Sequence, residues 1–247
     1  MTELEIVCVA TLFKEMLVSL GPLDEVPMKV TEEGISITSM GDGNVFLVSL
    51  NIPKECFAEF KYPSKTEKIY GFSKGDILKF MGSVKEEDIL QVEFKESKMI
   101  LKIMGKSKRR YVSSLLDLTG HNKIPSTDLC DTRVEIDSKF LKEDMAIAGL
   151  LGDVVVDLSI DADGNFCVSA GKDNGSEIEC IHEKEVTKIE ANSQVKSSYQ
   201  HKTLSNLIKL CKEECKIYFG KDIPVFITYF LADQAKVMYV LAPRVEN

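Results

Sequence analysis

The sequence lacks the patterns that mark membrane, secreted and thiol-redox proteins. No apolar stretch approaches the ~20 residues that a transmembrane helix needs, so no membrane span is expected. The first residues, MTELEIVCVA, have no basic region followed by an apolar run, which argues against a signal peptide. None of the seven cysteines forms a C-x-x-C pair. Free buried thiols in a reducing intracellular compartment are therefore expected.

Catalytic and cofactor-binding motifs are also missing. The chain contains no G-x-x-x-x-G-K-[ST] phosphate loop, no G-x-G-x-x-G and no G-x-S-x-G. The three histidines, His121, His182 and His201, stand far apart in the sequence and beside no obvious partner. These absences predict a protein that is not an enzyme and has no cofactor. A site assembled from residues distant in sequence stays open as an alternative.

Two segments resemble metal sites only in part. The DADGN segment at 161–165 has the start of a calcium loop, but its twelfth position falls on Ala170, where a glutamate is required. A hairpin turn explains that segment better. Cys211 and Cys215 could share a helix face, but zinc would need two more ligands at suitable spacing. No metal is therefore expected.

The composition is that of a globular protein with an acidic balance. The chain has 247 residues, of which 44% are hydrophobic, enough for one large or two medium domains. Its net charge of −8 argues against a general nucleic-acid binder, because phosphate contacts need positive charge. A local basic surface remains compatible with this balance.

Short strands separated by turn residues dominate what is present. Residues 28–53 read as three strands, and 88–116 read as a hairpin plus a third strand. Residues 154–171 form a further hairpin pattern with its turn at Asp163-Gly164, and 215–243 read as two or three strands. Both halves of the chain are therefore expected to be rich in antiparallel sheet.

Four segments have helical spacing of apolar residues instead. They are 11–20, 73–84, 138–148 and 202–212, and the second is expected to begin with a capping box at Ser73. Each half of the chain thus reads strand, helix, several strands, helix, several strands. A shift of about 130 residues overlays the halves, as in an internal duplication. The matches include Gly34 with Gly164, Ser39 with Ser169 and Lys79 with Lys209.

Positive charge gathers on these helical segments. With Lys85 included, they carry nine lysines and four acidic residues, although the whole chain is acidic. One interpretation is that the lysines only keep amphipathic helices in water. The other is a shared basic surface. The lysines are Lys14, Lys74, Lys79, Lys85, Lys139, Lys142, Lys202, Lys209 and Lys212.

The end of the chain carries the most specific pattern. Residues 219–244 contain Asp-Ile-Pro, a strand, a turn and then Leu-Ala-Pro, and the polar segment between the halves ends in Ile124-Pro125. With the duplicated plan and the length, these features make the chain resemble a DNA sliding clamp of the proliferating cell nuclear antigen (PCNA) type. The resemblance covers essentially the whole chain.

The resemblance implies a fold and a function. The fold is an α+β duplicated DNA-clamp fold, with two helices packed on antiparallel sheets in each of two domains. The implied domains are 1–117 and 133–247, joined by a connector at 118–132. Three chains would form a ring around duplex DNA, with helices lining the hole. The ring would be non-catalytic and would act inside the cell at chromosomal DNA, in the cytoplasm or nucleoid, or in a nucleus.

The resemblance also implies two binding surfaces. DNA polymerase, clamp loader, flap endonuclease and ligase would dock by short apolar peptide motifs, while DNA would be held without sequence preference by the helix lysines. The family commonly has an aromatic residue where Val240 stands. The implied partner-peptide pocket comprises Met40, Leu47, Leu118, Ile124, Pro125, Pro224, Val240, Ala242 and Pro243. The implied subunit interface comprises Lys108, Arg109, Arg110, Tyr111, Glu177, Ile178, Glu179 and Cys180.

Other functions stay open at this point. The chain could be a soluble enzyme on a duplicated α+β scaffold, or a monomeric processivity subunit that shares the fold without closing a ring. A ring could also contain three copies of this chain or this chain with paralogues. Mass in solution would separate a ring from a monomer.

Overall fold

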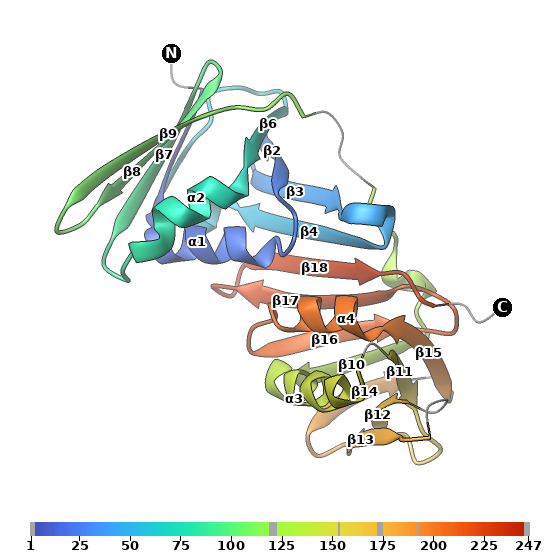
Figure 1. The fold of residues 1–247 in the computed structure, drawn as a ribbon. Helices are drawn as coiled ribbons and strands as arrows, with labels where there is room; N and C mark the ends of the chain where they lie inside the picture. Colours follow the sequence, from blue (N-terminus) through green and yellow to red (C-terminus); the bar gives the residue numbers. More distant parts are fainter. Residues whose placement is uncertain (1–2, 119–122, 153, 172–174, 192, 245–247) are drawn as a thin grey trace. The chain divides into compact units, whose positions relative to one another are not determined.

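The computed structural model describes residues 3–118, 123–152, 154–171, 175–191 and 193–244 (Figure 1). Contacts divide the chain into two compact units, which are described separately here. The first unit comprises 1–41, 48–124 and 230–237, and the second comprises 42–47, 125–229 and 238–247. The boundaries expected from the sequence, with a connector at 118–132, remain a prediction.

The two halves of the chain repeat one order of elements. Apart from 3-10 turns, the described residues of each half form a strand, an α-helix, five strands, an α-helix and three strands. The first half comprises β1 (Leu4–Val9), α1 (Ala10–Ser19), β2 (Glu25–Thr31), β3 (Gly34–Met40), β4 (Phe46–Pro53), β5 (Glu59–Lys61), β6 (Lys68–Ser73), α2 (Lys74–Phe80), β7 (Ile89–Lys95), β8 (Lys98–Met104) and β9 (Lys108–Ser114). The second comprises β10 (Thr132–Asp137), α3 (Ser138–Ala148), β11 (Val155–Ile160), β12 (Phe166–Ala170), β13 (Ile178–His182), β14 (Thr187–Ala191), β15 (Val195–Gln200), α4 (His201–Ile208), β16 (Glu214–Phe219), β17 (Val225–Leu231) and β18 (Ala235–Leu241).

Sheet topology repeats in the same way. The strand order β5-β1-β7-β8-β9 of the first half recurs as β14-β10-β16-β17-β18 in the second. The order β4-β3-β2-β6 recurs as β13-β12-β11-β15. The strand and helix segments expected from the sequence are confirmed, and so is the duplicated α+β plan. Strand β9 therefore corresponds to β18, and β13 corresponds to β4.

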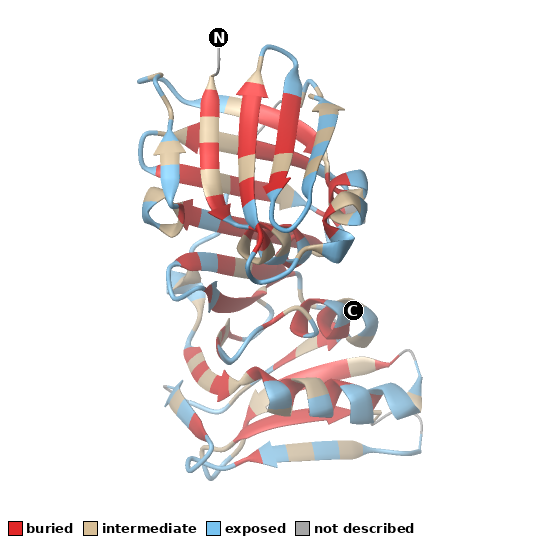
Figure 2. Ribbon diagram, turned by 90° about the vertical axis from the view of Figure 1, so that its left-hand side faces the viewer, coloured by how far each residue is buried: buried red, intermediate tan, exposed pale blue. Residues whose placement is uncertain are grey.

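Helices pack in pairs within each unit. Helix α1 lies against α2 in the first unit, and α3 lies against α4 in the second. The buried residues run mainly along the strands, as Figure 2 shows, and the helices add apolar side chains such as Phe13 and Leu204. One face of each helix is thereby used for packing, and the other is left for solvent.

One expected helix start is wrong in detail. The hydroxyl of Ser73 makes no capping hydrogen bond at the start of α2. Instead, the Lys74 backbone N–H donates to the Asp24 carbonyl at 2.8 Å. The preceding strand β6 continues in extended conformation up to Ser73 and delivers the chain to the helix without a capping box.

Candidate subunit, DNA and partner surfaces

Most of the predicted helix lysines reach solvent. Six are exposed, whereas Lys14 and Lys142 are half-buried and donate to backbone carbonyls: Lys14 to Gly82 at 3.4 Å and Lys142 to Cys211 at 2.8 Å. The exposed six are Lys79, Lys85, Lys139, Lys202, Lys209 and Lys212. The lysines that point to solvent therefore lie on or just beyond α2, α3 and α4.

The prediction for Lys74 is wrong. Its side chain is buried, and its ammonium group donates to the Gly21 carbonyl. Burial lowers the pKa of Lys74, and the nearby Asp24 carboxylate opposes that change. The sequence pattern placed Lys74 on the polar side of an amphipathic helix. The structure uses it in the first turn of α2 to satisfy the backbone at the end of α1.

Helix α4 and its C-terminal end carry exposed lysines without an acidic partner among the described residues. Lys202 and Lys209 lie one above the other and line a cavity of about 300 Å³ with His201, Ser205 and Asn206. By contrast, Lys79 is paired with Asp76 at 2.9 Å and Lys139 with Asp137 at 3.0 Å. In the part of the chain that the structure describes, Lys202 and Lys209 have no acidic partner within 4.0 Å. They could therefore meet an anionic polymer without first giving up an ion pair.

Strand β9 is the outer strand of its sheet in the first unit. Along it Lys108, Arg110 and Val112 are exposed, while Arg109 and Tyr111 point to the helix side and are half-buried. Tyr111 stacks on Phe80 of α2, with ring centroids 5.3 Å apart. An outer strand with unpaired backbone groups and apolar side chains is suited to pairing with another chain.

Arg109 of β9 makes contacts within its own chain. Its guanidinium donates to the hydroxyl of Ser83 and lies 3.3 Å from the buried carboxylate of Asp88. The resemblance did not imply this contact within its own chain. Strand β9 alternates and puts Arg109 on the inner side, so its membership of the implied subunit interface stays a prediction.

Strand β13 is the outer strand of its sheet in the second unit. Glu177 and Glu179 lie on its exposed side, whereas Ile178 and Cys180 are half-buried. Ile181, which follows, is 52% exposed. The acidic side of β13 and the basic side of β9 are thus both at sheet edges.

Sequence reasoning missed apolar residues beside β13. Ile147 at the end of α3 is 42% exposed, and Leu150 in the following 3-10 turn is 81% exposed. Helix α3 packs against β13, and Ile147 and Leu150 lie at and just beyond the end of this helix, while Ile181 lies on the exposed face of β13. The signal was in the sequence: Ile147 falls off the buried stripe of the 138–148 helix, and Leu150 lies just beyond its end.

The predicted peptide-pocket residues divide between a buried cluster and exposed positions. Leu47 and Val240 are buried and form one cluster with Phe226 in the second unit. Cys130, Tyr218 and Met238 pack against this cluster and are only partly buried. Phe226 was not predicted, and it places an aromatic ring beside Val240, where the family commonly has an aromatic residue of its own. Alternation along β17 could have indicated it.

The remaining pocket residues are accessible to different degrees. Met40, Ile124, Pro125 and Ala242 are exposed, and Leu118, Pro224 and Pro243 are half-buried. Leu118 packs close to Gly71 in the first unit. A Cβ atom added at Gly71 would lie only 2.7 Å from Cγ of Leu118. The Ala242 N–H donates to the Val45 carbonyl at 3.0 Å, which fixes the chain just beyond β18 in the second unit. Leu129, 68% exposed in the 3-10 turn Thr127–Leu129, is a further apolar residue that the sequence analysis missed.

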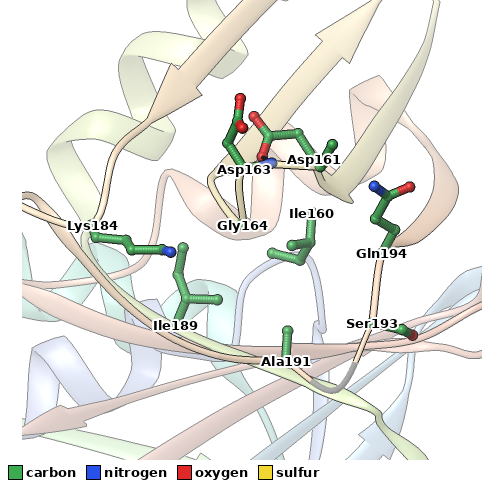
Figure 3. A pocket seen from close by; sticks show the side chains of 10 residues that line it. Ile160, Asp161, Asp163, Gly164, Lys184, Ile189, Ala191, Ser193 and Gln194 are labelled. Atoms are coloured by element: carbon green, nitrogen blue, oxygen red, sulfur yellow. Dashed lines mark hydrogen bonds between the residues drawn. The ribbon is translucent and has the colours of Figure 1, made fainter.

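The DADGN segment forms a hairpin turn between β11 and β12, as expected. Asp161 accepts hydrogen bonds from the Asn165 backbone N–H at 2.8 Å, the Asn165 side-chain amide at 3.0 Å and the Asp163 backbone N–H at 2.9 Å, and these bonds lower the pKa of its carboxyl. Figure 3 shows the open cavity of about 340 Å³ at this turn, with Lys184 reaching toward Gly164. Within the described residues, no cluster of three or more His, Cys, Asp and Glu side chains is placed to hold a metal ion.

The sequence expectations also concern membrane-spanning helices and disulfides. In the described part of the chain, no helix is both long and apolar enough to cross a bilayer. Among the same residues, the cysteines are all free. The family usually has an apolar linker residue near Asn122, and this position lies outside the described residues.

Known proteins with similar sequences and structures agree on one family. The family model "Proliferating cell nuclear antigen, N-terminal domain" matches residues 1–122. Proteins described as DNA polymerase sliding clamp match over 91% of this chain and 91% of their own length. They are 30% identical in Pyrococcus abyssi and 29% identical in Thermococcus fumicolans.

Solved structures give the same result. A PCNA from Thermococcus kodakaraensis superposes with a TM-score of 0.89 at 25% identity, covering 98% of this chain and all of the other. A complex of the C-terminal region of FEN-1 with A. fulgidus PCNA matches with a TM-score of 0.84 at 21% identity, covering 99% of both chains, and supports the fold alone. From its duplicated architecture and these matches, this chain belongs to the PCNA family of DNA sliding clamps.

Proposed function

We propose that three copies of this chain form a non-catalytic ring that encircles duplex DNA and tethers DNA polymerase and other replication and repair enzymes to it. The observation that carries the proposal is the pair of complementary open edges, β9 in one unit and β13 in the other. A ring removes open edges by pairing them between subunits. Its place of action is chromosomal DNA inside the cell.

The internal duplication supplies the pattern for this pairing. Strands β18 and β4 are the counterparts of β9 and β13 in the repeat. The chain just beyond β18 is hydrogen-bonded to the chain just before β4, through Ala242 and Val45. Pairing of β9 from one copy with β13 from the next repeats that arrangement between chains.

Charge and apolar surface favour identical copies as partners. On the exposed side, Lys108 and Arg110 of β9 would meet Glu177 and Glu179 of the β13 edge. Exposed pairs contribute only ~0–1 kcal/mol each, so apolar contacts must supply most of the affinity. Such contacts are available on both faces of the paired strands. On one face, the stacked Phe80 and Tyr111 would meet Ile147 and Leu150 of the next copy, and on the other face Val112 would meet Ile181.

The helix lysines suit a sequence-independent contact with DNA. Lysine is a mobile point charge, whereas base readout favours the planar forks of Arg, Asn and Gln. The proposed DNA-facing set is the predicted one without the buried Lys74. With the whole chain acidic, contact with DNA would be weak, and retention on DNA would come from the closed ring.

Partner enzymes would dock by a short apolar peptide on the predicted pocket residues. The support is the cluster of Leu47, Phe226 and Val240, with half-exposed Tyr218 and Met238 around it. An apolar floor suits an apolar anchor of a short docking peptide. The family resemblance implies flap endonuclease, clamp loader and ligase as such partners, and a solved PCNA of similar fold carries the C-terminal region of FEN-1.

The deciding experiment is the mass in solution, followed by processivity. Light scattering should give three times the chain mass of 27.6 kDa. On circular DNA, a matching DNA polymerase should also synthesise longer products when this protein is present. A particle of one chain mass at every concentration would contradict the ring. A trimer that never alters polymerase processivity would contradict the tethering function.

A further inference from the structure

A buried polar pair in the second unit joins helix α3 to the edge strand β13. The ring nitrogen Nε2 of His182 lies 2.7 Å from Oδ2 of Asp144, and the two residues are only 8% and 4% exposed. The imidazole lies between Phe140 and Phe166, with ring centroids 5.8 and 5.9 Å away. A polar contact enclosed by aromatic rings is held in one geometry, because neither group can turn to water.

A second β13 side chain reaches the same carboxylate. Burial raises the pKa of Cys180 to about 11, and the charge and hydrogen bond of Asp144 add to the effect. Cys180 and His182 are two residues apart, so they point to the same face of the strand. Ile181, between them, points to the opposite face and is 52% exposed.

This arrangement distinguishes one strand register from its neighbours. Strand β13 is paired with β12 alone among the described strands, and His182 is opposite Phe166. A slip of one residue would turn every β13 side chain to the other face. It would move His182 away from Asp144 and bring Ile181 inside, which would also remove Ile181 and Glu179 from the outer side of the edge.

The first half of the chain has no such side-chain pair at the corresponding positions. The shift of about 130 residues places His182 on Ile52 and Asp144 on Lys14. Ile52 is 3% exposed, and Lys14 is half-buried, with its ammonium group on the Gly82 carbonyl. The fold therefore does not require a polar pair at this place. The polar pair occurs in the second half of the chain, where the strand concerned, β13, is a free edge.

We propose that His182 and Asp144 form a register pair, which holds β13 in the one alignment that presents its outer face to a second copy of this chain. The proposal rests on the proposed ring. It makes His182 and Asp144 positioning residues for the subunit interface of that ring. Buried polar groups are often replaceable by apolar ones with little loss of stability, so a role in register explains their presence better than a role in stability.

The test compares three variants of the full chain with the wild type. Asp144→Leu/His182→Phe removes the polar contact and keeps an aromatic ring between Phe140 and Phe166. His182→Gln keeps a side-chain donor for Asp144. Thr38→Val/Ser49→Ala is the matched control, because it removes a buried contact of 3.3 Å between hydroxyls on β3 and β4. Trimer dissociation is followed by light scattering on dilution, and amide exchange is measured over residues 178–182.

The double variant should fold, with the concentration for half-dissociation of the trimer raised about tenfold or more. The backbone amides of β13 should exchange faster in the double variant than in the wild type. For His182→Gln and for the control, the concentration for half-dissociation should stay within about twofold of the wild-type value. Equal assembly of the double variant and the wild type would overturn the proposal. So would a double variant that fails to fold, because the pair would then be a requirement of the fold. A wild type that is monomeric throughout would instead refute the ring itself.

Discussion

Leu150 offers a sharp test of the proposed interface, because its side chain has almost no role within the single chain. It is 81% exposed in the 3-10 turn Gly149–Leu151, after α3. Replacing it with serine should change the free energy of unfolding of the monomer by less than about 0.5 kcal/mol, as for other exposed positions.

Assembly should respond much more strongly. Full burial of a leucine side chain is worth roughly 1.5–3 kcal/mol, and most of this remains to be gained at 81% exposure. If the next copy covers Leu150, Leu150→Ser should weaken each interface by about 2 kcal/mol, or roughly 30-fold in its dissociation constant. A closed ring contains this contact three times, so the trimer should dissociate at far higher concentrations than the wild type does.

The assay is sedimentation velocity over a dilution series, with urea unfolding of the same samples. Leu129→Ser is the matched control, since Leu129 is also an exposed leucine in a 3-10 turn, at 68%. It should leave the trimer intact and weaken peptide binding instead. If both variants assembled like the wild type, the interface would lie elsewhere. If both lost the trimer, the two surfaces would not be separate.

Three further predictions concern the other surfaces. Ile124→Glu or Pro243→Glu should abolish calorimetric binding of an apolar partner peptide and leave the trimer intact. Burying an unpaired charge costs several kcal/mol, whereas the whole binding free energy of a micromolar site is only about 8 kcal/mol. Unchanged affinity in both variants would mean that the site is misplaced. Phe226→Ala should lower the free energy of unfolding by about 3–5 kcal/mol, because a fully buried ring leaves a cavity in the pocket floor; a loss below about 1 kcal/mol in urea titrations would show that the ring is not packed there. Loss of four exposed lysines should reduce processivity on nicked circular DNA and flatten the salt dependence of DNA binding, which follows a slope of roughly −0.9 per phosphate engaged. The exposed Lys236→Ala on β18 serves as the control, and a quadruple variant that loads and supports synthesis like the wild type would refute the DNA-facing assignment. The four are Lys79, Lys202, Lys209 and Lys212.

The amino-acid sequence by itself determined the elements and their order. Period-two and helical spacing are local properties, so 138–148 predicted α3 with the same bounds, and the shift of about 130 residues predicted the duplicated plan. The stretch 219–244 and the linker end at Ile124-Pro125 were specific enough to indicate the family. The resemblance to that family, rather than local spacing, implied that the residues of β9 and β13 belong to the subunit interface.

Only the tertiary structure decided what individual side chains contact. Lys74 looks like a solvent lysine in its helix, but it is buried because the Gly21 carbonyl, 53 residues earlier, lies within reach. Arg109 looks like an edge charge, but it is held by Asp88 across a distance of 21 residues. Phe226 beside Val240, and His182 beside Asp144, are likewise contacts between separate elements. Spacing along a chain defines which face a residue occupies, whereas its partner depends on how elements far apart in sequence pack together.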